Sequence, residues 1–373
     1  MASHAGATEK IWFPKPVPSI SEVEKVYASI KDWGPFELLE STVYKDKDGM
    51  PRIDVWVQDA FECGYSQSAT TGMICILDTN TSDRGWGQKK ATGSNFGYIK
   101  PFSGELGELE QGGNIEVSPP TTKHPHGCLV VGKYGENGPS MADEMKSFFR
   151  IQNVQLAKNE DGTYEFCEVD VSYLAKSHLD EVLSFTADKI LIAAPHKATE
   201  CWERAAGVHA QYMAKTINTI CDERNLDPDG IPPEILNSTL AQYNNNLWND
   251  ISSAVEGIED QLGMEDTDRM LIPTLFFPWK GGANDARTGK ARSCPFPNRV
   301  NLIYSGGTFI FGDIEADDPV AGADPIKADL VGKVGSQNAK FVISDVLYDR
   351  AGDVHCASQA ARRSPTPGLV YGH

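Results

Sequence analysis

Three short segments of the chain combine side chains that could carry out nucleophilic catalysis. They are WVQDAFECGY (residues 56–65), SHLDEVLSF (177–185) and GDVHCAS (352–358). They supply the carboxylate of Asp59, the imidazole and carboxylate of His178 and Asp180, and the thiol of Cys356. A thiol can attack an electrophilic carbon while an imidazole moves protons and carboxylates hold a cationic substrate. The three segments are therefore candidates for catalytic segments.

Two of these segments also have ordinary structural interpretations. Ser177-x-x-Asp180 ahead of an apolar run is typical of a helix N-terminus, with Ser177 as the cap. If the same segment instead continues the strand expected over 164–173, His178 and Asp180 lie on one face and can address one ligand. The polar residues of 56–65 are equally typical of a solvated strand end.

Cys356 is the cysteine that we predict to be reactive. It follows His355 and lies within reach of Arg350 in a glycine-containing loop, an electropositive setting of the kind that lowers the pKa of a thiol. The alternative is an inert structural cysteine. The other cysteines form no Cys-x-x-Cys pair and show no zinc-like Cys/His spacing, and most lie in apolar surroundings typical of buried thiols. They are Cys63, Cys75, Cys128, Cys167, Cys201, Cys221 and Cys294.

The elements that must position these residues follow an α/β pattern. Apolar alternation predicts strands over 53–58, 72–78, 127–133, 164–173, 189–194, 300–304, 308–312 and 340–347. Helical periodicity predicts helices over 140–149, about 198–223 and about 233–262, and a first helix opened by the capping box Ser19-x-x-Glu22. No boundary divides the chain into halves, so one compact domain with insertions is the simpler interpretation.

Composition restricts the partners and the compartment. Fifty-two acidic residues against 34 Lys plus Arg give a net charge of −18, which disfavours nucleic acid and anionic membranes as partners. No membrane-spanning apolar run and no leader-type apolar region are present in the 373 residues. We expect a soluble protein, either cytoplasmic or secreted with its signal peptide absent from this chain. The Asn80 and Asn237 sequons would permit glycosylation of a secreted form.

Taken together, the segments resemble the catalytic domain of the protein-arginine deiminases. The matching motifs are WVQDAFECGY, GGNIEVSPP (112–120), SHLDEVLSF, FPNRVNLI (296–303) and GDVHCASQAARRSP (352–365). They follow the family's order and separations over about residues 35–365. The resemblance implies the pentein fold, a five-bladed α/β propeller of ββαβ modules. It also implies one catalytic domain over 35–373, a tail and first helix over 1–34, and no immunoglobulin-like modules ahead of them.

The resemblance implies a role for each catalytic residue. Cys356 would be the nucleophile, His178 the acid and base, and Asp59 and Asp180 the carboxylates that hold the substrate guanidinium. That cation is planar and almost always protonated, so paired carboxylates can orient it. Attack of the thiolate would expel ammonia and leave a thiouronium intermediate, which water would hydrolyse to citrulline.

Substrate-binding residues also follow from the resemblance. Trp56 would pack against the substrate arginine, and Arg84 and Arg350 would line the rim of the cleft. Arg84 would hold backbone carbonyl groups, which favours arginine within a protein or peptide over free arginine. The oligomeric state does not follow from these motifs.

Calcium is the cofactor that the resemblance implies. A first site would use the side chains of Gln58, Glu62 and Glu116 with the carbonyl groups of Gly112 and Ile115, all hard oxygen donors. A second site would use Asp78, Thr79 and Asp83. Ala60 stands where family members with that second site supply a glutamate, and Gly112 replaces an aromatic residue.

Three other functions remain open at the level of sequence. One is deimination of free arginine, agmatine or another small guanidine. A second is a calcium-binding module that recognises arginine without catalysis, against which the presence of all four catalytic residues counts. The third is a metal hydrolase built on His178, Asp180 and Glu181, whose close spacing rarely completes a metal site.

Overall fold

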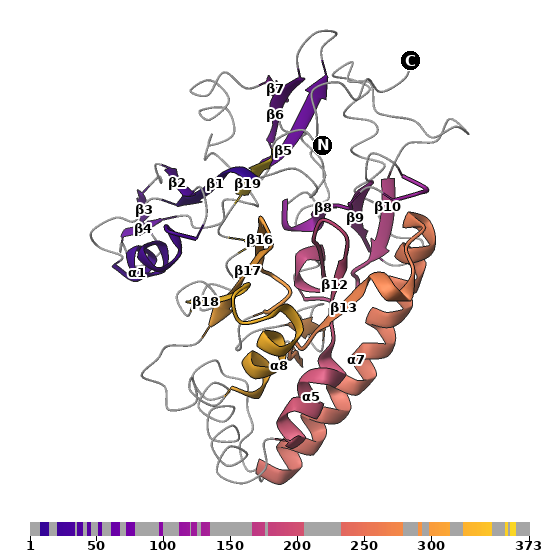
Figure 1. Ribbon diagram of the computed structural model, residues 1–373. Helices are drawn as coiled ribbons and strands as arrows, with labels where there is room; N and C mark the ends of the chain where they lie inside the picture. Colours follow the sequence, from indigo (N-terminus) through magenta and orange to yellow (C-terminus); the bar gives the residue numbers. More distant parts are fainter. Residues whose placement is uncertain are drawn as a thin grey trace.

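The structure is a computed structural model of the 373-residue chain. It describes residues 8–14, 21–33, 36–39, 43–45, 51–53, 61–67, 72–78, 97–99, 112–119, 121–124, 128–134, 166–175, 178–204, 233–278, 290–292, 298–313, 324–344, 355–356 and 359–362. Strands and helices alternate along these residues (Figure 1), so the predicted α/β class is confirmed.

Five three-stranded sheets occur among the described residues, and all five have the same topology. In spatial order they are β19 (Gln359–Arg362), β1 (Thr8–Pro14) and β2 (Phe36–Leu39); β5 (Phe61–Gln67), β6 (Gly72–Asp78) and β7 (Gly97–Ile99); β8 (Ile115–Val117), β9 (Leu129–Lys133) and β10 (Phe166–Asp170); β11 (Leu183–Phe185), β12 (Ile190–Ala193) and β13 (Arg269–Ile272); and β16 (Ile303–Ser305), β17 (Thr308–Asp313) and β18 (Ala339–Ile343). In each sheet the central strand pairs antiparallel with the first strand and parallel with the third.

The parallel pair in each sheet explains where the helices lie. Parallel neighbours need a long crossover connection, which is usually helical. Helix α1 (Ser21–Ile30) connects β1 to β2, and α8 (Pro325–Val334) connects β17 to β18. Helices α5 (Pro195–Arg204) and α7 (Pro233–Leu262) lie between β12 and β13. In three of the five sheets a described helix therefore connects the two parallel strands.

One sheet joins the two ends of the chain. Strand β1 pairs with β19, so the indigo and yellow strands lie side by side in Figure 1. Beneath this region, Ile11 and Phe13 of β1 pack with Val26 and Ile30 of α1 in a small apolar cluster. Residues 355–356 directly precede β19, so this sheet helps to fix the loop that carries Cys356.

The larger core lies between the central sheets and the helices α5 and α7. Figure 1 shows α5 beside α7, and α7 packs against β10. Gln261 of α7 accepts a hydrogen bond from the Glu168 backbone N–H (3.1 Å) and donates one to its carbonyl (3.3 Å). The helix ends at Gly263 (φ +67°), where the Met264 N–H bonds back to the Glu259 carbonyl. The long helix α7 thus packs against α5, β10 and β14 (Phe277–Pro278).

Several predicted boundaries agree with the structure, and two strands were predicted wrongly at one end. Helix α7 and strand β6 have the predicted bounds, and α5 begins three residues before the predicted 198. The strand predicted over 164–173 ends at Asp170, because residues 172–173 form a turn. The strand predicted over 300–304 was wrong at its start, because residues 298–301 form a turn and β16 begins at Ile303. The helix predicted over 140–149 lies outside the described residues.

The remaining short elements are two hairpin pairs and three single turns of 3-10 helix. They are β3 (Val43–Lys45) with β4 (Pro51–Ile53), β14 (Phe277–Pro278) with β15 (Ala291–Arg292), η2 (Gly112–Asn114), η3 (Leu179–Glu181) and η4 (Asp266–Asp268). Elements η2 and η3 contact each other, and β8 contacts η3. These contacts bring two of the segments singled out in the sequence to one place.

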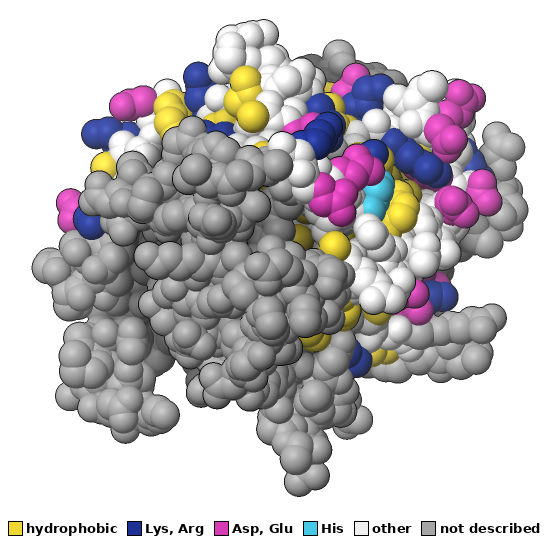
Figure 2. Space-filling model, turned by 90° about the horizontal axis from the view of Figure 1, so that it is seen from below, with side chains coloured by type: hydrophobic (Ala, Val, Ile, Leu, Met, Phe, Trp, Pro, Cys, Tyr) yellow, Lys and Arg dark blue, Asp and Glu magenta, His cyan; other side chains and the backbone are white. Residues whose placement is uncertain are grey.

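The described surface has mixed charge. Acidic and basic side chains are interspersed over the coloured part of the face in Figure 2, and no large area of one sign occurs there. Among the described helices, none combines the length and the apolar character needed to cross a bilayer.

Candidate active site

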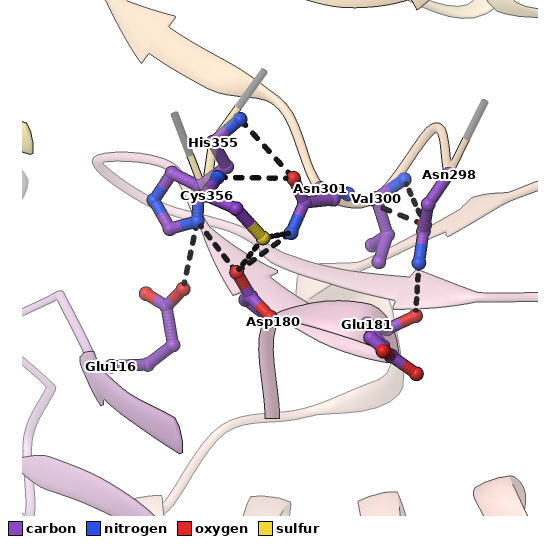
Figure 3. Close-up of polar contacts among 8 residues, drawn as sticks. All are labelled: Glu116, Asp180, Glu181, Asn298, Val300, Asn301, His355 and Cys356. Atoms are coloured by element: carbon purple, nitrogen blue, oxygen red, sulfur yellow. Dashed lines mark hydrogen bonds and ion pairs between the residues drawn. The ribbon is translucent and has the colours of Figure 1, made fainter. Parts of the chain in front are cut away.

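Cys356 and Asp180 meet in the interior of the molecule, although 175 residues separate them (Figure 3). The Cys356 thiol donates a hydrogen bond to Asp180 Oδ2 at 3.3 Å. Cys356 is 6% exposed and Asp180 is fully buried. Asp180 Oδ1 has no hydrogen-bond partner within the described part of the chain. A buried carboxylate oxygen is costly to leave unpaired, so this atom is available for a donor that the described residues do not supply.

Asn301 connects the thiol to the carboxylate. Its amide nitrogen donates to Asp180 Oδ2 at 2.6 Å and to Cys356 Sγ at 3.1 Å. Its carbonyl oxygen accepts the backbone N–H groups of His355 (3.1 Å) and Cys356 (3.3 Å). One buried side chain thus fixes both the backbone and the sulfur of Cys356.

A tight turn holds Asn301 in place. The Asn298 side-chain oxygen accepts the backbone N–H groups of Val300 and Asn301, which is the Asx-turn geometry that asparagine favours. The Asn298 amide donates to the Glu181 carbonyl at 2.8 Å. The turn is therefore attached directly to η3, which carries Asp180 (Figure 3).

Arg299 anchors the same turn to the neighbouring sheet. Its guanidinium is 3% exposed and lies 2.8 Å from Asp324 and 3.5 Å from Asp313. It also donates to the Gly312 carbonyl. Asp324 caps α8 by accepting the Ile326 N–H, so Arg299 connects the turn to β17 and to the start of α8. The turn is part of a rigid framework and not a surface loop.

The conformation of residues 178–181 corrects a prediction. The strand β10 ends at Asp170, and His178 is the N-cap residue of the 3-10 turn η3, so this segment does not continue the strand. An α-helix capped by Ser177 was not formed either, and Ser177 lies outside the described residues. The tight turn is held by two hydrogen bonds from different residues. The Asp180 carboxylate accepts a hydrogen bond from the Asn301 amide, and the Glu181 backbone carbonyl accepts one from the Asn298 amide.

His178 lies beside Asp180 along the chain. It is 6% exposed, its side chain makes no capping hydrogen bond, and its Nε2 has no partner among the described residues. Two residue steps span at most about 7 Å, which keeps its Cα close to that of Asp180. An unsatisfied buried imidazole nitrogen at this position could exchange a proton with a bound molecule.

His355 and Glu116 extend the polar cluster. His355 Nδ1 lies 3.3 Å from Asp180 Oδ2 and 3.8 Å from Glu116 Oε1. Glu116 is 4% exposed and belongs to β8, next to η2. The carbonyl-bearing residues Gly112 and Ile115 that we predict to bind calcium are in the same buried segment. The Glu116 carboxylate and the carbonyl groups of Gly112 and Ile115 are oxygen donors, which fits calcium.

The remaining predicted site residues are not described. Residues Trp56, Gln58, Asp59, Thr79, Asp83, Arg84 and Arg350 lie outside the described residues. Glu62 and Asp78 are placed in β5 and β6 by their backbone alone. The predictions for these residues stay predictions. For the metal hydrolase, the donor atoms of His178, Asp180 and Glu181 do not form a metal-binding group in the described part of the chain.

Asn298 and Asn301 are functional candidates that the sequence interpretation missed. Both lie in FPNRVNLI, a motif noted for its resemblance but given no role. The signal was the pair of asparagines three residues apart, of which the first can close a turn and the second can then project from it.

We predict that Asn301→Ala lowers kcat/KM on the order of 100-fold, mostly through kcat. The reason is that the substitution removes the hydrogen bonds from the backbone N–H groups of His355 and Cys356 and the one to the Cys356 sulfur, and a small misplacement of a nucleophile lowers the rate strongly. Steady-state kinetics would measure it. Asn338→Ala is the matched control, because Asn338 also bonds a carbonyl, that of Val334, but at the end of α8. Equal effects of the two substitutions would contradict the positioning role.

We predict that Gly132→Ala destabilises the fold by about 1–3 kcal/mol. A methyl group at Gly132 in β9 would lie 2.8 Å from Asn114 Cγ, and Asn114 is completely buried in η2. The displaced side chain would disturb the segment that carries Ile115 and Glu116. Urea unfolding would measure the change. Gly332→Ala in α8 is the control, since nothing lies within 4 Å of its added methyl group; an equal loss there would exclude a steric cause.

Comparison with known proteins gives a consistent result. A family model for protein-arginine deiminase matches residues 39–366. Protein-arginine deiminase type-3 of Rattus norvegicus is 26% identical over 273 residues, covering 68% of this chain and 38% of the relative. Protein-arginine deiminase type-4 of Homo sapiens is 25% identical over 372 residues, covering 92% of this chain and 51% of the relative. The chain thus spans about half or less of the length of these curated relatives.

A comparison with solved structures agrees on the fold. An X-ray structure of a proposed agmatine deiminase has a TM-score of 0.52 and 11% sequence identity, with 97% of this chain and 95% of that chain covered. At this identity the similarity concerns the fold alone.

Proposed function

This chain belongs to the protein-arginine deiminase family, and from that premise we propose that it hydrolyses peptidyl-arginine to peptidyl-citrulline and ammonia in a calcium-dependent reaction. The observation that supports this most directly is the buried cluster of Cys356, Asp180 and Asn301, in which Asp180 Oδ1 has no partner among the described residues. A substrate guanidinium would supply the missing donor and the missing positive charge.

The first half of the reaction forms a covalent intermediate. The Asp180 carboxylate accepts two guanidinium N–H groups, with Asp59 as the proposed second carboxylate. In the reacting form the thiol proton is on His178, so that Cys356 is a thiolate and His178 an imidazolium. Cys356 Sγ then forms a bond to the guanidinium carbon, which becomes tetrahedral. His178 gives a proton to the departing nitrogen, the C–N bond breaks, and ammonia leaves. The product of this half is an S-alkylthiouronium attached to Cys356.

The second half releases citrulline. His178, now neutral, takes a proton from water as the water oxygen attacks the thiouronium carbon. The C–S bond breaks and its electron pair returns to sulfur, so Cys356 is restored as a thiolate. The balance is one guanidinium and one water in, and one citrulline and one ammonium ion out. Asn301 donates to the sulfur at 3.1 Å and can stabilise its negative charge in both halves.

We propose that one catalytic domain, predicted over residues 35–373, forms five blades around this cluster. Strand β1 and helix α1 precede residue 35, but β1 pairs with β19 and β2 and α1 connects β1 to β2, so the proposed domain includes them as part of a blade. The five sheets of identical topology support the proposal, as does the pairing of β1 with β19, which would close the ring. Trp56, Arg84 and Arg350 would form the cleft that selects peptide-bound arginine.

Calcium would supply a fixed positive charge that orders the segments bearing the acidic residues. Glu116 and the carbonyl groups of Gly112 and Ile115, with Gln58 and Glu62, would hold it, while the second site at Asp78, Thr79 and Asp83 stays a proposal of the same kind. Gln58 directly precedes Asp59, so binding there would fix a substrate carboxylate. The expected result of adding excess chelator is loss of turnover, measured as ammonia release and restored by calcium.

Magnesium is the control for that experiment. It prefers six ligands at about 2.0–2.1 Å and keeps its water, so it should not replace calcium. Full activity in excess chelator would contradict the proposed calcium requirement. It would not contradict the proposed deiminase reaction.

The substrate class is tested by comparing an N-blocked arginine amide with free arginine and agmatine. We expect the blocked amide to be turned over at the higher kcat/KM, since the cleft would recognise peptide carbonyl groups. Preferential turnover of a free guanidine would instead support the small-guanidine alternative. Calcium-dependent stabilisation with no turnover of any substrate would support the non-catalytic alternative.

A further inference from the structure

A second polar cluster lies away from the catalytic residues, between the sheet of β8, β9 and β10 and the end of α7. It consists of His124, Cys128 and Cys167, which are 5%, 1% and 2% exposed. One donor atom from each residue lies within 4.8 Å of the others. The proposed function uses none of these three residues.

His124 has a clear structural role through one ring nitrogen only. The loop of residues 121–124 caps the C-terminus of α7: Thr121 donates to the Leu262 carbonyl, Lys123 to that of Asp260, and His124 Nε2 to that of Gln261 at 2.8 Å. A carbonyl oxygen can only accept, so Nε2 carries the proton. In the neutral ring Nδ1 is then a bare lone pair.

That lone pair is buried and has no hydrogen-bond partner in the described part of the chain. Capping of α7 therefore gives His124 Nε2 a structural role, but it does not account for the burial of Nδ1. A histidine whose second nitrogen is fixed by a backbone carbonyl is the usual arrangement of a metal ligand.

The two cysteines supply soft donors at the same place. Cys128 directly precedes β9, and Cys167 lies in β10, which pairs with β9 in parallel. Their sulfur atoms are 2.9 Å apart. In a tetrahedral zinc site with Zn–S bonds of about 2.3 Å, the two sulfurs would be about 3.8 Å apart. A side-chain rotation that moves one sulfur atom by about 1 Å is sufficient to reach this separation.

From this geometry we propose that His124, Cys128 and Cys167 form a binding site for a thiophilic divalent metal ion, with Zn²⁺ as the natural occupant. Two thiolates and a neutral imidazole around a divalent ion have no net charge, which makes the complex inexpensive to bury. A monovalent ion would leave a negative charge there. Calcium takes oxygen ligands, so this site differs in chemistry from the proposed calcium site.

Metal binding would connect three parts of the fold. The ion would join the loop that caps α7 to the edge of β9 and to β10. Cys128 also exchanges backbone and side-chain hydrogen bonds with Ser118, two residues after Glu116. The proposed site therefore stabilises the sheet that holds Glu116, without contacting the catalytic cysteine.

Cobalt titration of the full chain tests the proposal. The reduced protein is stripped of metal and titrated with Co²⁺ in a Cys356→Ala background, so that the catalytic thiol cannot contribute. We expect one equivalent to bind with thiolate-to-cobalt absorption in the near ultraviolet and tetrahedral bands in the visible, displaced by Zn²⁺ and unaffected by Ca²⁺. This signal does not depend on catalysis. The experiment therefore tests the metal-site proposal independently of the proposed deiminase function.

Substitutions assign the signal to this cluster. Cys167→Ser and His124→Gln should each weaken binding on the order of 100-fold or more. The glutamine keeps an N–H group for the Gln261 carbonyl, which separates helix capping from metal binding. Cys201→Ser is the matched control, since Cys201 is a buried cysteine in α5 outside the cluster.

Three results would overturn the proposal. They are the absence of saturable thiolate absorption, absorption that survives in both Cys167→Ser and His124→Gln, and a Cys128–Cys167 disulfide that persists under reducing conditions in place of metal. If Cys167→Ser does not fold, thermal unfolding of the parent decides: Zn²⁺ must raise its Tm, and must do so less in His124→Gln.

Discussion

Replacement of Cys356 with alanine is expected to abolish ammonia release, with a loss of kcat of about 10⁴-fold or more. The reason is that no other described thiol faces Asp180 and Asn301, and without sulfur the covalent intermediate cannot form. Release of ammonia from a blocked arginine amide, measured with calcium present, gives the result directly.

Cys201→Ala is the matched control for this prediction. Cys201 is also buried, burial raises the pKa of its thiol, and it lies in α5, outside the cluster of Cys356, Asp180 and Asn301. The control is expected to keep its activity at temperatures below its unfolding transition. Retention of activity in Cys356→Ala, or an equal loss in both variants, would contradict the nucleophilic role.

Replacement of Asp180 with asparagine is expected to remove most of the activity while leaving the fold intact. Loss of one buried charge from a charge pair costs about 2–5 kcal/mol, which corresponds to about 30- to 5,000-fold in kcat/KM. The effect on stability should be small, because in the free protein Asp180 Oδ1 has no hydrogen-bond partner among the described residues. The asparagine oxygen can still accept from Asn301.

Steady-state kinetics and urea unfolding of the same Asp180→Asn preparation would measure the expected loss of kcat/KM and the expected small change in the free energy of unfolding. Asp188→Asn is the control, because Asp188 is an exposed carboxylate in the turn between β11 and β12. A loss of stability in Asp180→Asn that accounts for its lost activity would make Asp180 a structural residue and not a substrate ligand.

Much of the fold could be predicted from local patterns. Helix α7 was predictable because proline begins it and an apolar stripe continues for eight turns, and the central strands were predictable because they are continuous apolar runs. The repetition of one topology in five sheets was not visible in local patterns, since it resides in strand pairing and not in internal sequence similarity; only the resemblance to a known family implied it. The strand expected at 300–304 failed because Asn298 closes a turn through its own side chain.

The site shows the same division. Cys356 could be singled out from its neighbours His355 and Arg350, but its partnership with Asp180 followed only from the order of several motifs. Asn301 was missed because its role depends on contacts 55 and 121 residues away. The cluster of His124, Cys128 and Cys167 was missed for a related reason: it forms through the register of β9 and β10, and its spacing resembles no local metal motif.

The most direct test of the proposed chemistry is the identity of the product. A peptide with one arginine and both ends blocked would be incubated with the wild-type protein and calcium, and then analysed by mass spectrometry alongside an ammonia assay. We predict conversion of that arginine to citrulline with one ammonia released per citrulline. An unchanged peptide in the presence of folded, calcium-loaded protein would contradict the assignment of this chain as a protein-arginine deiminase in function.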